Sequence, residues 1–123
     1  MRVIRWPFIS LMLLAVSALL SAEANAETTS AGSAAYQNYC AECHNANLAG
    51  GAHGAALIGE RFRTRWGKGG VPPLATFIRS MMSMNVPANA PPSVVNGIAA
   101  FLLRRNGVAV SELKPEETTW QGA

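Results

Sequence analysis

The chain has 123 residues, half of them hydrophobic, and a formal net charge of +3 at neutral pH. This length provides for one small domain with a limited hydrophobic core and leaves no room for a second. The positive charge is too small and too scattered along the sequence to indicate a nucleic-acid-binding protein. A chain this short needs something to supplement its core.

Residues 1–26 have the pattern of a secretory signal peptide, with two arginines ahead of an uncharged apolar run over residues 8–20. At about 1.5 Å per residue, that run is too short as a helix for the roughly 30 Å hydrocarbon core of a membrane. We therefore expect cleavage after Ala26, a periplasmic domain over residues 27–123 and no permanent membrane span. Retention as an uncleaved anchor is the alternative, because neighbouring alanines lengthen the apolar run.

The mature part begins with a short predicted helix that enters the segment CAECH, because Gly32, Tyr36 and Cys40 recur every four residues. Residues 45–59 predict a loop, since glycines and asparagines separate its few large apolar side chains. A basic and aromatic stretch, ERFRTRW, follows this loop and leads to three glycines.

Prolines suited to a helix start open residues 71–84, and four large apolar side chains then recur at helical spacing: Leu74, Phe77, Ile78 and Met81. We expect a helix here with these side chains, Met81 included, in the core. Residues 85–92 hold three prolines and predict an extended loop.

A further helix is predicted from Ser93, where apolar residues again recur at helical spacing and Asn106-Gly107 supplies the stop. Residues 108–123 predict a tail laid over the surface and pinned by Trp120. No alternating pattern indicates a strand of useful length. The sequence therefore predicts an all-α domain of three to five short helices.

The two cysteines of the chain are Cys40 and Cys43, and His44 directly follows the second. C-x-x-C-H is the attachment signature of c-type haem. Two cysteines three apart on a helical turn face the same side and can each form a thioether with a haem vinyl group, while the histidine binds the iron. A thioredoxin-like redox pair and half of a zinc site are the rival interpretations, and neither explains His44.

Iron held by His44 on one face needs a ligand on the other. Met82 and Met84 lie where the predicted helix gives way to the proline-containing loop, and a thioether from either is a suitable soft ligand. His53 is a nitrogen candidate, but its place between two glycines is more typical of an exposed loop histidine. Arg61, Arg65 and Trp66 are candidates for contacts with the haem propionates, and a solvated basic face is the alternative.

The mature chain resembles small class I c-type cytochromes, in particular the cytochrome subunits and domains associated with quinoprotein (PQQ-dependent) alcohol dehydrogenases. The residues that carry this resemblance are YQNYCAECH, NANLAGGAHGAALIGERFRTRW, FIRSMMSMNVP and AAFLLRRNG. The resemblance implies the class I cytochrome c fold around one covalent haem, with Gly32 and Tyr36 on a helix that crosses the C-terminal helix near Ala100 and Phe101.

The resemblance also implies that Met82 is the distal iron ligand. Two positions depart from the family pattern. Ser83 stands where the family has proline after the ligand, so the loop is less stiff and Met84 stays an alternative. Ala55 replaces the proline whose carbonyl oxygen accepts a hydrogen bond from the proximal histidine, and the alanine carbonyl can serve in the same way.

These observations predict a single-electron carrier, not an enzyme, because six iron ligands leave no position for a substrate. By resemblance, its donor is a PQQ-dependent dehydrogenase and its acceptor a further cytochrome or a terminal oxidase. One alternative is a haem protein with an open distal site, either a gas-binding sensor or a weak peroxidase, which would follow if Ser83 let the Met82 loop swing away. Another is a subunit whose haem serves mainly as a structural staple in a larger complex.

Overall fold

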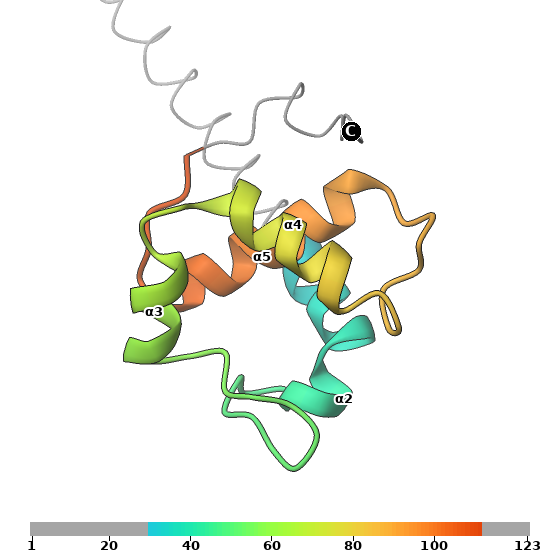
Figure 1. Ribbon diagram of the computed structural model, residues 1–123, viewed down its shortest axis with the longest axis horizontal. Coiled ribbons are helices and arrows are strands. Elements are labelled where there is room, and N and C mark those ends of the chain that lie inside the picture. The colour runs from blue at the N-terminus through green and yellow to red at the C-terminus, as the bar shows by residue number, and fades with distance from the viewer. Residues whose placement is uncertain (1–29, 112–123) are drawn as a thin grey trace, which may run out of the picture.

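The computed structural model describes residues 30–111 and folds them into helices joined by loops, without a strand in this part of the chain (Figure 1). Residues 30–39 are helical, and the helices that follow are α2 (Ala41–His44), α3 (Glu60–Trp66), α4 (Val71–Met81) and α5 (Pro92–Arg105). The predicted all-α class is confirmed for this region. The predicted signal peptide and the pinning residue Trp120 lie outside the described residues.

The helix over residues 30–39 crosses α5 at two glycines. A Cβ atom added to Gly32 would lie 2.3 Å from the carbonyl oxygen of Gly97 and 3.2 Å from the Cβ of Phe101, so only glycine permits this approach of the two backbones. The ring of Tyr36 packs on that of Phe101 with 5.4 Å between centroids. The expected crossing at Phe101 is thus confirmed, and its closest point is Gly97, which the sequence analysis did not single out.

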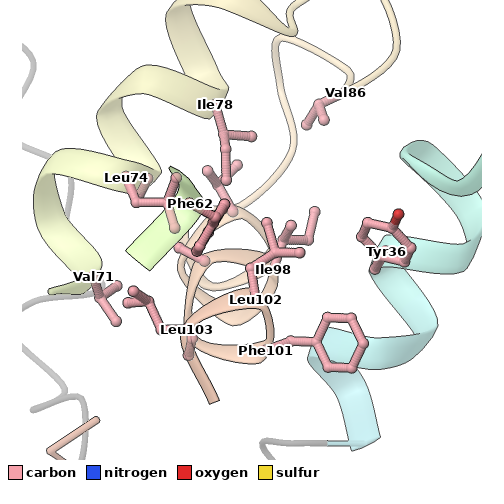
Figure 2. Packing of buried hydrophobic residues seen from close by; sticks show 14 of the residues in the cluster. Tyr36, Phe62, Val71, Leu74, Ile78, Val86, Ile98, Phe101, Leu102 and Leu103 are labelled. Carbon is pink, nitrogen blue, oxygen red and sulfur yellow. The ribbon is translucent and has the colours of Figure 1, made fainter. Parts of the chain in front are cut away.

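Helix α4 lies across α5 (Figure 1) and buries Val71, Leu74, Ala75 and Ile78. In Figure 2 the larger of these side chains point toward Ile98, Leu102 and Leu103 of α5. The prediction that Met81 also packs in the core is wrong, since 62% of its surface is exposed. Met81 lies at the edge of the buried face and is the last residue of α4, so the core ends before its side chain.

Helix α5 begins at Pro92, one residue before the predicted start. Proline fits the first turn of a helix, where its missing N–H costs no hydrogen bond. The predicted extended loop therefore ends at Pro91. At the other end, Asn106 caps α5 and Gly107 has a positive φ of 74°, which confirms the predicted stop.

Helix α3 was not predicted, although its sequence carries a helical signal. Phe62 is buried, and Trp66, four residues later, is partly buried against the core, while the arginines between them are exposed. Two aromatic residues at this spacing share one helix face. The high charge and the glycines around the stretch masked this pattern.

Candidate functional site

The CAECH segment consists of Cys40, which is the N-cap residue, and the single turn of α2 that follows it. The backbone N–H groups of Cys43 and His44 both donate to the carbonyl oxygen of Cys40, at 3.3 and 3.0 Å. Cys40 and Cys43 are therefore about one turn apart and lie on the same side of it. Both are free cysteines and both are partly buried, with Cys40 packed against the hydrophobic core.

The ring of His44 is oriented by the loop that follows it. Its Nδ1 lies 2.7 Å from the carbonyl oxygen of Ala55. Because a carbonyl oxygen only accepts hydrogen bonds, the proton resides on Nδ1 and the lone pair of Nε2 is available to a metal. The expectation that the Ala55 carbonyl serves as the partner of His44 is confirmed.

Gly54 allows the loop to reach this position. A Cβ atom on Gly54 would lie 2.8 Å from Nδ1 of His44 and 2.6 Å from the carbonyl oxygen of Cys43. The loop is fixed further by hydrogen bonds from Gly50 N to the His44 oxygen at 3.0 Å and from Leu57 N to the Leu48 oxygen at 2.8 Å. The orientation of the imidazole is thus built into the backbone of residues 45–59.

The cysteine pair does not have the character of a redox-active dithiol. Burial, with a smaller contribution from the neighbouring Cys43, raises the pKa of the Cys40 thiol to about 11. A reactive thiol of the thioredoxin kind needs a lowered pKa. At neutral pH Cys40 is therefore a protonated thiol, which argues against the redox-pair interpretation. Among the described residues, no group of three His, Cys, Asp or Glu side chains is placed to hold a metal ion.

The three methionines after Ser80 lie at the end of α4 and in the turn beyond it. Met82 caps α4 through a 2.9 Å bond from its N–H to the Ile78 oxygen, and 36% of its surface is exposed. Met84 is exposed to 97%. Met82 is thus the methionine of the three with the most protein around it, which favours it over Met84 as a candidate ligand. His53 is exposed on its loop, as expected.

All three candidate propionate contacts lie on α3, and two of them, Arg65 and Trp66, stack on each other. The guanidinium carbon of Arg65 lies 4.9 Å from the centroid of Trp66 and 5.0 Å from that of Phe77. The Trp66 and Phe77 rings are themselves 5.0 Å apart, so Arg65 covers an aromatic pair that joins α3 to α4. Arg61 is exposed and takes no part in this stack.

Two polar side chains near the site escaped the sequence analysis. Asn106 was interpreted only as a helix stop, yet it is 6% exposed, donates to the oxygens of Leu57 and Leu102 at 2.9 and 2.8 Å and accepts from the N–H of Gly59 at 2.9 Å. It joins the end of the 45–59 loop to α5. Arg79 donates to the carbonyl oxygen of Ala90 at 3.1 Å. The Asn106 bonds to Leu57 and Gly59 and the Arg79 bond to Ala90 connect residues 11 to 49 positions apart in sequence, so no local pattern predicts them.

No protein-family model matches the chain, and no curated protein or solved structure matches it either. No helix in the described range, residues 30–111, combines the length and apolar character needed to cross a membrane.

Proposed function

We propose that the protein is a mono-haem c-type cytochrome of class I that carries single electrons in the periplasm. The observation that supports this most directly is the hydrogen bond between Nδ1 of His44 and the Ala55 oxygen. This bond leaves Nε2 of His44 free to bind a metal. His44 directly follows Cys43, and Cys40 and Cys43 lie on the same helical turn. Metal-binding histidines are held in this manner by a bond at their second nitrogen.

The residues present fit a covalent haem. Cys40 and Cys43 are free thiols on one side of a turn, the arrangement that two thioether bonds to one porphyrin require. Cys40 touches the hydrophobic core, so an apolar ring attached there would extend that core and supplement it. When bound, the haem iron would store the transferred electron.

Met82 is the proposed distal ligand. Its place at the end of α4 lets its side chain leave the helix, and its thioether would favour the reduced iron and raise the potential relative to a second histidine. Arg65 and Trp66 are proposed to donate hydrogen bonds to the propionates. The stack on Phe77 restrains the Arg65 side chain, and this reduces the entropy lost on binding a carboxylate.

The proposed donor, by resemblance, is a PQQ-dependent dehydrogenase, and the proposed acceptor is a further cytochrome or a terminal oxidase. Transfer between such partners needs only a brief contact through a small interface. No substrate chemistry is proposed for the chain itself.

Expression in a bacterial host competent in cytochrome c maturation tests the proposal. We expect a coloured periplasmic protein whose haem stays attached after denaturation, with sharp low-spin absorption bands in the reduced form. The Cys40→Ala/Cys43→Ala double variant should lose the covalent haem, whereas Ser33→Ala, a substitution outside the CAECH turn, should retain it. A colourless wild-type protein with both thiols free would contradict the proposal.

Ser83 favours one second possibility, a haem protein with an open distal site. It lacks the rigidity of proline at the position after Met82, and a loop that moved Met82 away from the iron would leave the distal position open. A gas-binding sensor or a weak peroxidase would show high-spin iron that takes up carbon monoxide readily. An electron carrier would show a methionine–iron charge-transfer band in the oxidised form and bind carbon monoxide slowly.

A further inference from the structure

The segment that follows Met82 is held to the helix before it by one charged side chain. The guanidinium Nη2 of Arg79, in α4, donates to the carbonyl oxygen of Ala90 at 3.1 Å. This bond spans eleven residues and closes the segment of residues 82–90 into a loop with its two ends tied together.

The same loop has an apolar attachment. Val86 is 3% exposed and belongs to the core cluster, and Figure 2 shows it on the loop. Its N–H donates to the carbonyl oxygen of Met82 at 3.2 Å. Val86 thus holds the middle of the loop, and the Arg79 bond holds its far end.

Arg79 and the loop residues line a common groove. The groove has a volume of about 360 Å³, and Arg79 is the lining residue that comes from α4. The other lining residues belong to the loop and to the start of α5: Ser83, Val86, Pro87, Ala88, Asn89, Ala90, Pro91 and Pro92. Arg79 is partly buried. A partly buried guanidinium favours a geometry in which its hydrogen bond is kept, because breaking that bond leaves a charge poorly solvated.

The composition of the loop explains why such a tether has an effect. Pro87, Pro91 and the turn bond from Ala90 N to the Pro87 oxygen at 2.9 Å stiffen its second half. Ser83 to Asn85 contain no proline, and these residues directly follow Met82. Turn bonds from the N–H groups of Asn85 and Val86 to the Met82 oxygen, both at 3.2 Å, connect these residues to Met82. Met82 is thereby coupled to the loop whose far end the Arg79 bond holds.

We infer that Arg79 is a positioning residue for Met82: its bond to Ala90 keeps the loop closed and so holds the methionine sulfur available to the iron. The identity of Met82 as the ligand rests on the proposed function. The closure of the loop does not, because it rests on the Arg79 bond.

Replacement of Arg79 by leucine in the full haem-bearing chain tests the inference, with Arg105→Leu as the matched control, because Arg105 is exposed in the last turn of α5. We expect cyanide to replace the distal ligand of oxidised R79L about tenfold faster than in wild type, the scale of one weakened charged hydrogen bond. R79K, which keeps a donor, should fall between the two, and R105L should match wild type.

Hydrogen exchange at the Val86 and Ala90 amides provides a readout that does not depend on the haem. Both amides should exchange faster in R79L and at the wild-type rate in R105L. Unchanged exchange in R79L would overturn the inference whatever the iron ligand is. Faster exchange with an unchanged cyanide rate would also overturn it, since the loop would open without releasing the ligand. If R79L does not fold, the same two measurements, the cyanide rate and the amide exchange, are made on R79K with Arg105→Lys as its control.

One further result would contradict the proposed identity of the iron ligand without bearing on the closure of the loop. If Met82→Leu retains the methionine–iron band, Met82 is not the ligand. In that case the exchange rates still establish whether Arg79 closes the loop.

Discussion

Tyr36 donates its hydroxyl hydrogen to the carbonyl oxygen of Asn45 at 2.7 Å, while its ring packs on Phe101. The residue thereby connects the helix crossing to the position directly after His44. A disturbance of the crossing is consequently transmitted to the loop that orients the imidazole.

The first prediction concerns the pH dependence of stability. Burial, with a smaller contribution from Cys40, raises the pKa of Tyr36 to about 12 from an ordinary value near 10. Between these values the unfolded chain loses a proton that the folded protein keeps, so the free energy of unfolding falls as the pH rises from 10 to 12. Urea unfolding across this range should show that fall in wild type and a shallower one in Tyr36→Phe. Tyr39→Phe, which leaves the Tyr36 hydroxyl in place, should retain the wild-type slope.

The second prediction concerns the two glycines of the helix crossing, which are not equivalent. A Cβ on Gly32 would meet backbone at 2.3 Å, whereas a Cβ on Gly97 would lie 3.5 Å from its nearest neighbour, an ordinary contact. Gly32→Ala should destabilise the fold by about 2–3 kcal/mol. Gly97→Ala should be neutral or stabilising by up to about 1 kcal/mol, because alanine is the better helix former. Thermal unfolding of the two variants measures the difference, and equal effects would contradict the crossing geometry.

The third prediction concerns Gly54. Alanine at this position would force the loop away from Nδ1 of His44 and from the Cys43 carbonyl, and the bond to the Ala55 oxygen would lengthen or break. We expect a higher reduction potential and a broadened low-spin spectrum, because the bond orients the histidine and makes it a more basic ligand, and a less basic ligand stabilises the oxidised iron less. Gly51→Ala is the matched control: its Cβ would come no closer than 3.2 Å to the end of the Asn45 side chain, and its spectrum should remain that of wild type.

The fourth prediction concerns the buried amide of Asn106. Asn106→Ala removes three hydrogen bonds and leaves backbone groups of Leu57 and Gly59 without this partner. The free energy of unfolding should fall by about 2–4 kcal/mol. Asn85 is exposed on the loop after α4, so Asn85→Ala should change it by less than about 0.5 kcal/mol. Comparable denaturant midpoints for the two variants would count against the structural role of Asn106.

The fifth prediction separates the methionines. Met82→Leu should abolish the methionine–iron charge-transfer band of the oxidised protein, because leucine has a similar volume and no sulfur. Met81→Leu and Met84→Leu should leave the band intact, since both side chains are more exposed than that of Met82. Loss of the band in the Met84 variant alone would assign the ligand to Met84.

Helices with a long apolar period were predictable from sequence, as α4 and α5 demonstrate. Which of their residues are buried was harder to predict. Met81 continues the apolar spacing of α4, but it lies past the point where α5 covers that helix. Helix α3 was missed because seven residues with three arginines give a weak amphipathic signal. Its packing comes from Phe62 and Trp66, whose partners lie elsewhere in the chain.

The candidate site likewise has features that were predictable from sequence and features that were not. The CAECH turn and the role of the Ala55 carbonyl were expected, the former from local spacing and the latter from resemblance. The tethers made by Asn106 and Arg79 depend on which loops the fold brings together, and no local pattern contains that information. The role proposed for His44 follows from its neighbours in sequence, whereas the groups that hold its loop in place could not be predicted from theirs.

The crossing of residues 30–39 over α5 has a consequence for biogenesis. In the folded protein the Cys40 thiol is partly buried against a core that includes Phe101 and other residues of α5. Until α5 has been synthesised and packs against residues 30–39, Cys40 lacks this part of its cover. For the proposed cytochrome, haem attachment at Cys40 would be easiest before the crossing closes, and slower closure of this non-local contact would prolong that interval.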